Sequence, residues 1–174
     1  MNRILAVLFF IIIHSTCFSQ DIKFFNHRPT KNLHITVAGE GGLLSFNQEK
    51  LRLISFKSIL VTKIGLGASI DSSFTKPMYG YMTIPASLSL CIGERKHLFE
   101  MGMSATVFLR INDPVYEFSV SPIVGYRYQP LKENKLVLRI YAAFPYSLDF
   151  STYYKLKETR ALLVPLGISI GKCF

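Results

Sequence analysis

Five charged residues are the first candidates for chemistry in this sequence, because each interrupts a segment in which large apolar residues recur at every second position. They are Glu49, Lys63, Glu100, Arg127 and Arg139. Carboxylates and basic groups that face a common interior could line an open pore or offset one another's desolvation as ion pairs. The choice depends on the elements that carry these residues and on the side to which each element turns its charges.

Histidines are the second set of candidates, since a lipid-modifying enzyme needs a nucleophile, a base and an orienting group within hydrogen-bond reach. Beyond the N-terminal leader the chain has His27, His34 and His97. His27 precedes the first expected strand and His97 falls in a turn, so only His34, with Glu40, could build such a site. No serine is obviously paired with them. We therefore expect a protein that is not an enzyme, with no catalytic, cofactor-binding or metal-binding residues.

The elements that position these residues are β-strands. From residue 32 onward large apolar residues alternate with small or polar ones, and turn residues separate the alternating segments. In residues 79–92, for example, Met82, Ile84 and Leu88 alternate with serine and threonine. The pattern predicts strands in residues 32–39, 43–51, 57–70, 79–92, 98–110, 116–129, 135–148 and 161–174.

The last of these segments, residues 161–174, sets branched apolar residues on one face and mostly small residues on the other. This pattern suits a strand that closes a small membrane barrel. Its terminal Phe174 fits the signal by which such barrels are recognised for insertion. The closing strand must pair with the first strand, at residues 32–39.

The glycine-rich segment at residues 39–42 decides the number of strands. Odd positions carry the apolar residues before it and even positions carry them after it, which a single straight strand cannot do. The glycines therefore form either a tight turn, giving eight strands, or a bulge, giving seven. Bacterial single-chain barrels have even strand numbers, which favours the turn.

The two faces favour a membrane barrel over a soluble one. A charge that faced the middle of a bilayer would cost about 2–4 kcal/mol, so the charged residues must face the lumen. We expect Glu100, Arg127 and Arg139 to form an ion cluster, with Glu49 and Lys63 as a second pair nearby. An eight-stranded barrel is just wide enough for side chains to fill it, so the cluster is expected to be structural. A soluble β-sandwich is the alternative fold.

The chain divides into three parts. Residues 1–20 have a short basic start, an unbroken apolar stretch and a small-residue site, which predict a secretory signal peptide cleaved after Ser19 or Gln20. Residues 21–31 have no clear period and are expected to lead through the periplasm. Residues 32–174 are expected to form the barrel.

Charge and cysteines limit the partners. The formal net charge of +9 and a secretory signal point to anionic lipid headgroups or polysaccharide rather than nucleic acid. Because the basic residues scatter over many turns, solvated turns are the simpler explanation. In an eight-stranded barrel Cys91 and Cys173 would lie on opposite strands, so two free thiols are expected.

The sequence resembles the small outer-membrane β-barrel proteins of Bacteroidota, most of which are uncharacterised. The similarity covers nearly the whole mature chain and is carried by residues 39–47, 64–67, 84–102, 124–130 and 165–174. It implies an outer-membrane location and brings no established activity. Lys172 departs from the pattern, since such closing strands usually place an aromatic or apolar residue there.

The expected protein is thus an integral barrel of the bacterial outer membrane, with a side-chain-filled lumen and a structural or binding role in the envelope. A lipid-modifying barrel enzyme and a narrow channel are the alternatives. The expected partners are outer-membrane lipid and lipopolysaccharide, and the barrel-assembly machinery during insertion. Aromatic residues are expected to form belts at both membrane boundaries. They are Tyr79, Tyr116, Phe144 and Tyr146 at one boundary and Phe99, Tyr126, Tyr128 and Phe174 at the other.

Overall fold

The structure, a computed structural model, describes residues 29–55, 57–70, 80–111, 116–144, 146–147 and 164–174. The expected signal peptide at residues 1–20 and most of the lead-in lie outside this part of the chain. Among the described residues, no helix has the length and apolar character needed to cross a bilayer.

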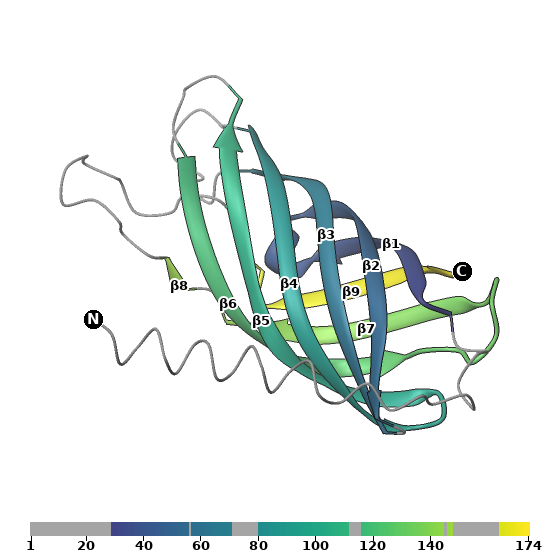
Figure 1. Cartoon of the computed structure of the whole chain (residues 1–174). Coiled ribbons are helices and arrows are strands. Elements are labelled where there is room, and N and C mark those ends of the chain that lie inside the picture. Colours follow the sequence, from purple (N-terminus) through teal and green to yellow (C-terminus); the bar gives the residue numbers. More distant parts are fainter. Residues whose placement is uncertain (1–28, 56, 71–79, 112–115, 145, 148–163) are drawn as a thin grey trace, which may run out of the picture.

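Nine strands and one short 3-10 turn make up the described fold (Figure 1). Their bounds are β1 (Lys31–Ala38), η2 (Gly39–Gly41), β2 (Leu44–Ser55), β3 (Ser58–Ile70), β4 (Gly80–Glu94), β5 (His97–Arg110), β6 (Tyr116–Tyr128), β7 (Leu136–Ala143), β8 (Tyr146–Ser147) and β9 (Leu166–Cys173).

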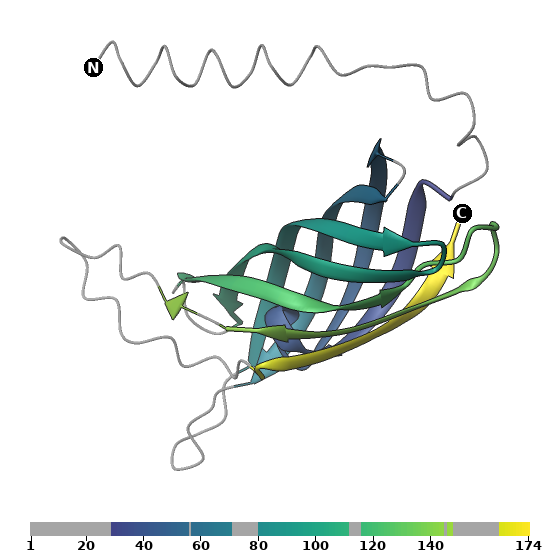
Figure 2. The ribbon, with the colours of Figure 1, turned by 90° about the horizontal axis from the view of Figure 1, so that it is seen from below.

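The strands close into an antiparallel barrel with eight main strands, as the alternation predicts. Each main strand pairs with the main strands before and after it in sequence. Strand β9 pairs with β1, which closes the ring (Figure 2). Ile35 lies opposite Ile170 at this closure. The two-residue β8 extends the line of β7, pairing with β6 at Ser119 and Val120. Closure leaves the main strands without an open edge, which rules out the β-sandwich.

The glycine-rich segment is a turn and not a bulge. Strands β1 and β2 run antiparallel on either side of it, with Val37 opposite Leu44. Gly39 and Gly42 have φ of 85° and 90°, in the left-handed region that glycine adopts at little steric cost. Strand β2 continues to Ser55, beyond the predicted end at residue 51, so the strands beside the turn are long enough for the barrel.

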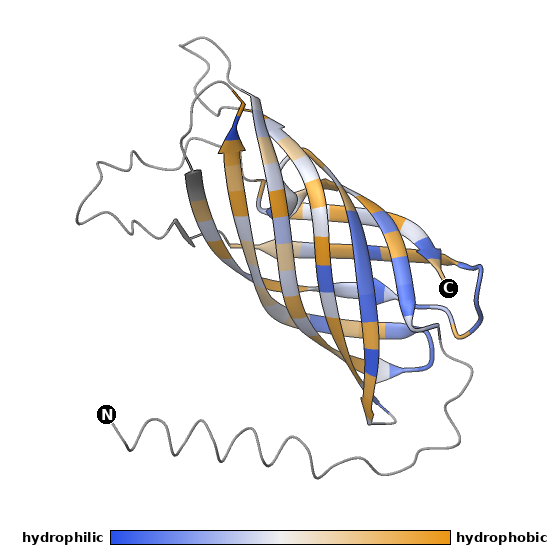
Figure 3. Cartoon of the chain, turned by 45° about the horizontal axis from the view of Figure 1, so that its top comes forward, coloured by the Kyte–Doolittle hydropathy of each residue, from blue (hydrophilic) through white to orange (hydrophobic). Residues whose placement is uncertain are grey.

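Side chains alternate strictly between the two faces of the barrel wall. The outward face is apolar, and Figure 3 shows orange residues recurring along each strand. Leu88 and Ile168 are 52% and 58% exposed there. The inward face carries mainly small, polar and charged residues, such as Ser89 and Ser169, which are both 2% exposed, with some buried apolar ones such as Ile59 and Phe108. This arrangement is the inverse of a soluble barrel, whose interior would be apolar.

The two ends of the barrel differ. The short connections at Lys57, at Arg95–Lys96 and at residues 129–135 lie at one end, which we call the short-turn end. The described start of the chain is at this end too, because the amide of Lys31 donates to the carbonyl of Phe174 at 3.2 Å. The opposite end holds the tips of β3, β4, β5 and β6.

Candidate functional site

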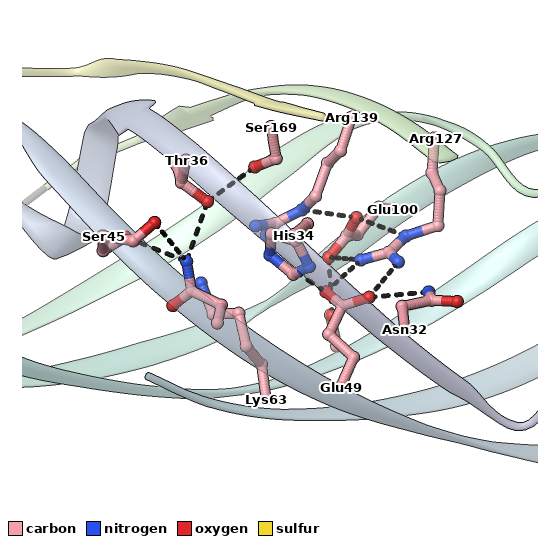
Figure 4. A network of polar contacts seen from close by, with 12 residues as sticks. Asn32, His34, Thr36, Ser45, Glu49, Lys63, Glu100, Arg127, Arg139 and Ser169 are labelled. Atoms are coloured by element: carbon pink, nitrogen blue, oxygen red, sulfur yellow. Dashed lines mark hydrogen bonds and ion pairs between the residues drawn. The ribbon is translucent and has the colours of Figure 1, made fainter. Parts of the chain in front are cut away.

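The lumen of the barrel holds nearly all of the buried charge in the described part of the chain. Because side chains alternate, strands β1, β2, β3, β5, β6 and β7 each turn at least one charged or titratable group inward (Figure 4). The buried set is His34, Glu40, Glu49, Lys63, Glu100, Arg127 and Arg139, with exposed fractions of 5% or less. Buried charges need partners, so their contacts decide what the lumen can do.

Arg127 is the centre of the ion cluster. Its Nη1 and Nη2 donate to the two carboxylate oxygens of Glu49 at 2.5 and 2.8 Å, in the two-pronged geometry that a planar guanidinium favours. Its Nε donates to Glu100 at 3.1 Å. On the far side of Glu100, Arg139 Nε donates to the same carboxylate at 2.9 Å. The predicted association of Glu100, Arg127 and Arg139 is therefore present in the structure.

The prediction that Glu49 and Lys63 pair with each other is wrong, because each residue pairs with another member of the cluster. The two residues are opposite one another in the β2–β3 ladder, as a pairing argument requires. The Lys63 ammonium nevertheless contacts the carboxylate of Glu40, while Glu49 reaches across the lumen to Arg127. The reason is that the barrel curves around a common interior, so an inward side chain meets strands beyond its ladder neighbours.

Glu40 enters the lumen from the β1–β2 turn, whereas the sequence reasoning associated it with His34 and not with the ion cluster. The η2 turn is fully buried and contacts β4 and β5 as well as β7 and β9, so it lies within the ring of strands (Figure 2). The Glu40 carboxylate also accepts from Arg139 Nη1 at 3.4 Å. The sequence did carry a signal for this position: Glu40 has an even residue number, and the residues of β1 that face the lumen also have even numbers.

Hydrogen bonds from threonine side chains to backbone carbonyls hold the inserted turn in place. Thr106 Oγ1 donates to the carbonyl of Glu40, and Thr83 Oγ1 donates to the carbonyl of Gly41, both at 2.7 Å. A Cβ on Gly39 would lie 2.2 Å from the hydroxyl of Tyr141, which shows how closely the turn approaches β7. The η2 turn therefore lies inside the lumen as a plug, next to the charged cluster that the Glu40 carboxylate joins.

The charges in the lumen balance one another. Three carboxylates (Glu40, Glu49, Glu100) face three cations (Lys63, Arg127, Arg139), and each carboxylate contacts at least one cation. Balanced, hydrogen-bonded groups offset much of their desolvation cost, whereas a single unpaired buried charge would cost several kcal/mol. The arrangement suits a closed structural network better than a path for ions.

Neutral polar side chains extend this network along the barrel axis. Asn32 Nδ2 donates to Glu49 at 3.0 Å and to the side-chain oxygen of Gln129 at 2.9 Å. Further along, Asn47 Nδ2 donates to Thr36 Oγ1 at 2.9 Å, and Thr36 lies 2.8 Å from the hydroxyl of Ser169. Sequence reasoning missed these residues individually, although all have the inward parity of their strands.

An apolar layer lines the β2–β5 side of the lumen between the ion cluster and the short-turn end. Its members are Leu51, Ile59, Val61, Cys91 and Leu98, each buried and in mutual contact. On β2, β3 and β5 an inward apolar residue thus lies between the inward charge and the short-turn end, and Cys91 on β4 joins them.

The histidines do not have the neighbours that the enzyme hypothesis requires. His34 is buried with its Nε2 at 3.8 Å from Glu49, while Glu40 is engaged by Lys63 and Arg139. His97 lies exposed at the short-turn end, with Nδ1 at 2.5 Å from the Tyr126 hydroxyl. His27 is outside the described residues. The suggested association of His34 with Glu40 is therefore not the contact that the structure forms, since His34 lies beside Glu49.

Cys91 and Cys173 are free and buried, as the strand order requires. Strands β4 and β9 lie on opposite sides of the barrel. The Cys173 thiol donates to the carbonyls of Lys132 and Lys135 at 3.2 and 3.3 Å, so it fastens the β6–β7 connection to β9. Within the described ranges, no group of three or more His, Cys, Asp or Glu residues could hold a metal ion.

Comparison with known proteins adds no relative: no family model, curated protein or solved structure matches the chain significantly. The class that the geometry itself defines is a closed eight-stranded antiparallel barrel with an inserted turn and a charged lumen. The resemblance to the small barrels of Bacteroidota stays a prediction.

Proposed function

We propose that the protein is an integral barrel of the bacterial outer membrane with a closed lumen, and that its role in the envelope is structural or binding rather than enzymatic. The observation that carries the proposal is the outward apolar face. Residues such as Phe46, Ile64 and Leu66 are 57–61% exposed on neighbouring strands β2 and β3. Monomeric soluble proteins rarely expose apolar patches of more than a few hundred Å², whereas lipid requires such a band.

The positions of the outward aromatic residues support the same proposal. Phe99 and Tyr126 lie opposite one another in the β5–β6 ladder near the short-turn end, and both are exposed, as is the terminal Phe174. Phe144, toward the other end of the barrel, is 54% exposed. Rings of aromatic residues at the two edges of an apolar band are typical of membrane barrels. Under this proposal the short-turn end faces the periplasm.

A closed lumen favours a structural or binding protein over a channel. The inserted η2 turn, the balanced ion network and the apolar layer lie in series along the axis. Each would have to move before hydrated ions could pass. Outer-membrane lipid and lipopolysaccharide would surround the barrel, and the assembly machinery would recognise its closing strand through Phe174.

The test is to refold the mature chain into lipid vesicles and then into planar bilayers. We expect a folded band on unheated gels that shifts on boiling, protection of the strands from protease, and no conductance above the background of empty bilayers. Failure to associate with vesicles would contradict the membrane proposal. Reproducible conductance steps from the folded protein would contradict the closed lumen and favour a narrow channel.

A further inference from the structure

The basic residues that are dispersed along the sequence gather at one end of the barrel. The short turns all lie there, and their exposed cations join those of the nearby strand ends: Lys57, Arg95, Lys96, Lys132, Lys135 and Lys172. The described acidic residues of these turns are only Glu94 and Glu133. Figure 3 shows this end, beside the C-terminus, as largely blue. Scattered turns in sequence have thus become a basic rim in space.

One part of this rim is hollowed into a groove. A groove of about 470 Å³ lies between the β4–β5 turn and the connection from β6 to β7. It is lined by Lys96, Tyr128, Pro130, Leu131, Lys132, Lys135 and Leu136. The lining therefore combines three ammonium groups with a wall of aliphatic and aromatic carbon. Leu136 is 52% exposed and continues into the outward apolar face of β7.

The charge in the groove is not neutralised by neighbouring carboxylates. Lys96, Lys132 and Lys135 have no ion pair among the described residues. Glu94 is engaged elsewhere: the Lys57 ammonium lies 2.5 Å from its carboxylate, and this hydrogen bond lowers the pKa of Glu94. Glu133 is exposed in the same connection but does not line the groove.

The frame of the groove is held by backbone contacts. The carbonyl of Lys96 accepts from the amide of Gln129 at 2.8 Å, which ties the β4–β5 turn to the end of β6. The Cys173 thiol binds the carbonyls of Lys132 and Lys135, which ties the other wall to β9. The three lysines are therefore presented from a fixed scaffold, which reduces the entropy lost when a ligand binds.

We propose that this groove binds one anionic phospholipid of the surrounding membrane, with its phosphate among Lys96, Lys132 and Lys135 and an acyl chain along Leu131 and Leu136. Charge complementarity selects the headgroup, and continuity with the outward apolar face selects a lipid over a free anion. The inference rests on the proposed membrane function and deepens it, because it names a lipid class and the leaflet on the short-turn side.

The test uses the full mature protein, folded in detergent micelles and studied by native mass spectrometry with added lipid. We expect phosphatidylglycerol to be retained in preference to phosphatidylcholine. Each lysine near an anionic lipid contributes about fivefold to binding, so Lys96→Gln/Lys132→Gln/Lys135→Gln should bind phosphatidylglycerol on the order of 100-fold more weakly. The matched control is Lys31→Gln/Lys50→Gln/Arg52→Gln, which removes the same charge from the same end, on β1 and β2 and outside the groove, and should retain the lipid.

The possible results separate the two proposals. Equal retention of both lipids, or equal loss in the two triple variants, would overturn the groove while leaving the barrel proposal intact. Displacement of the lipid by glycerol phosphate or by a soluble anionic polysaccharide at similar concentrations would also overturn it, since the acyl chain would then contribute nothing. A chain that failed to fold in micelles or vesicles at all would instead count against the proposed membrane function.

Discussion

Arg127 and Glu49 form a bidentate ion pair directly across the barrel. Their strands, β6 and β2, are separated by three others in either direction around the ring, yet the guanidinium nitrogens lie 2.5 and 2.8 Å from the carboxylate oxygens. Both side chains are 1% exposed. The pair therefore ties opposite walls together and sets the distance between them at the level of the charged network.

The first prediction concerns this pair. Arg127→Met should destabilise the folded barrel by about 3–5 kcal/mol, because Glu49 and Glu100 lose a buried cation. Glu49→Met should also destabilise it, leaving excess positive charge. The measurement is urea unfolding in lipid vesicles, followed by the mobility of the folded band.

The double variant Arg127→Met/Glu49→Met is the control for charge as opposed to packing. Because it removes one charge of each sign and fills the space with apolar atoms, it should be more stable than either single variant. Strictly additive losses would show that the pair does not act as a coupled unit.

The second prediction concerns the inserted turn. Glu40→Lys places a third cation beside Lys63 and Arg139. Repulsion among the three cations should drive the η2 turn out of the lumen. We expect a lower stability and the appearance of conductance in planar bilayers. Glu133→Lys makes the same charge change at an exposed position and should remain silent. A Glu40→Lys barrel that folds and stays as stable and silent as the parent would contradict the plug.

The third prediction compares two positions on the outward face of β4. Leu88 lies near the middle of the strand and Ile92 near its short-turn end, and both are exposed at 52% and 40%. Leu88→Arg should destabilise the barrel in a bilayer by about 2–4 kcal/mol, and Ile92→Arg by about 1 kcal/mol or less, because the cost of a charge falls toward the membrane boundary. Equal costs in vesicle unfolding would argue against a bilayer centred on this band.

The fourth prediction concerns the two thiols. Cys91 and Cys173 are both buried at 0% exposure and lie on opposite strands. In the folded barrel neither should react with a maleimide, and both should react after boiling in detergent, with no reductant needed. Mass spectrometry reads the number of adducts. A disulfide-linked species in the folded protein would contradict the order of the strands.

The strands could be predicted from the sequence because the same alternation of outward and inward residues holds along every main strand. Every main strand has one apolar side turned outward and one side turned to the lumen, so alternation alone predicted the strands and the side of each charge. The parity change at the glycines predicted either a turn or a bulge, and the even strand number of bacterial barrels favoured the turn. Strand ends were less well predicted, since β2 continues four residues beyond its apolar pattern.

The partners within the lumen could not be read in the same way. Lys63 and Glu49 are ladder neighbours, and local pairing is all that a sequence pattern supplies. Their actual partners depend on the curvature of the closed ring and on a turn that folds inward instead of outward. Glu40 was therefore assigned to the wrong neighbour, although its type and parity suited the interior. The groove in the basic rim was missed for a related reason, since its lining depends on how neighbouring turns pack in space.

The central claim is that lipid surrounds the outward face and that the lumen excludes it. The chain has no tryptophan, so a single tryptophan reports on one position without background. We would introduce Leu88→Trp on the outward face and Phe108→Trp at a buried inward position, and refold each variant in vesicles that contain brominated lipid. Strong quenching at position 88 and weak quenching at position 108 is the predicted result. Equal quenching at the two positions, or stronger quenching at 108, would contradict a membrane barrel with a closed, charged interior.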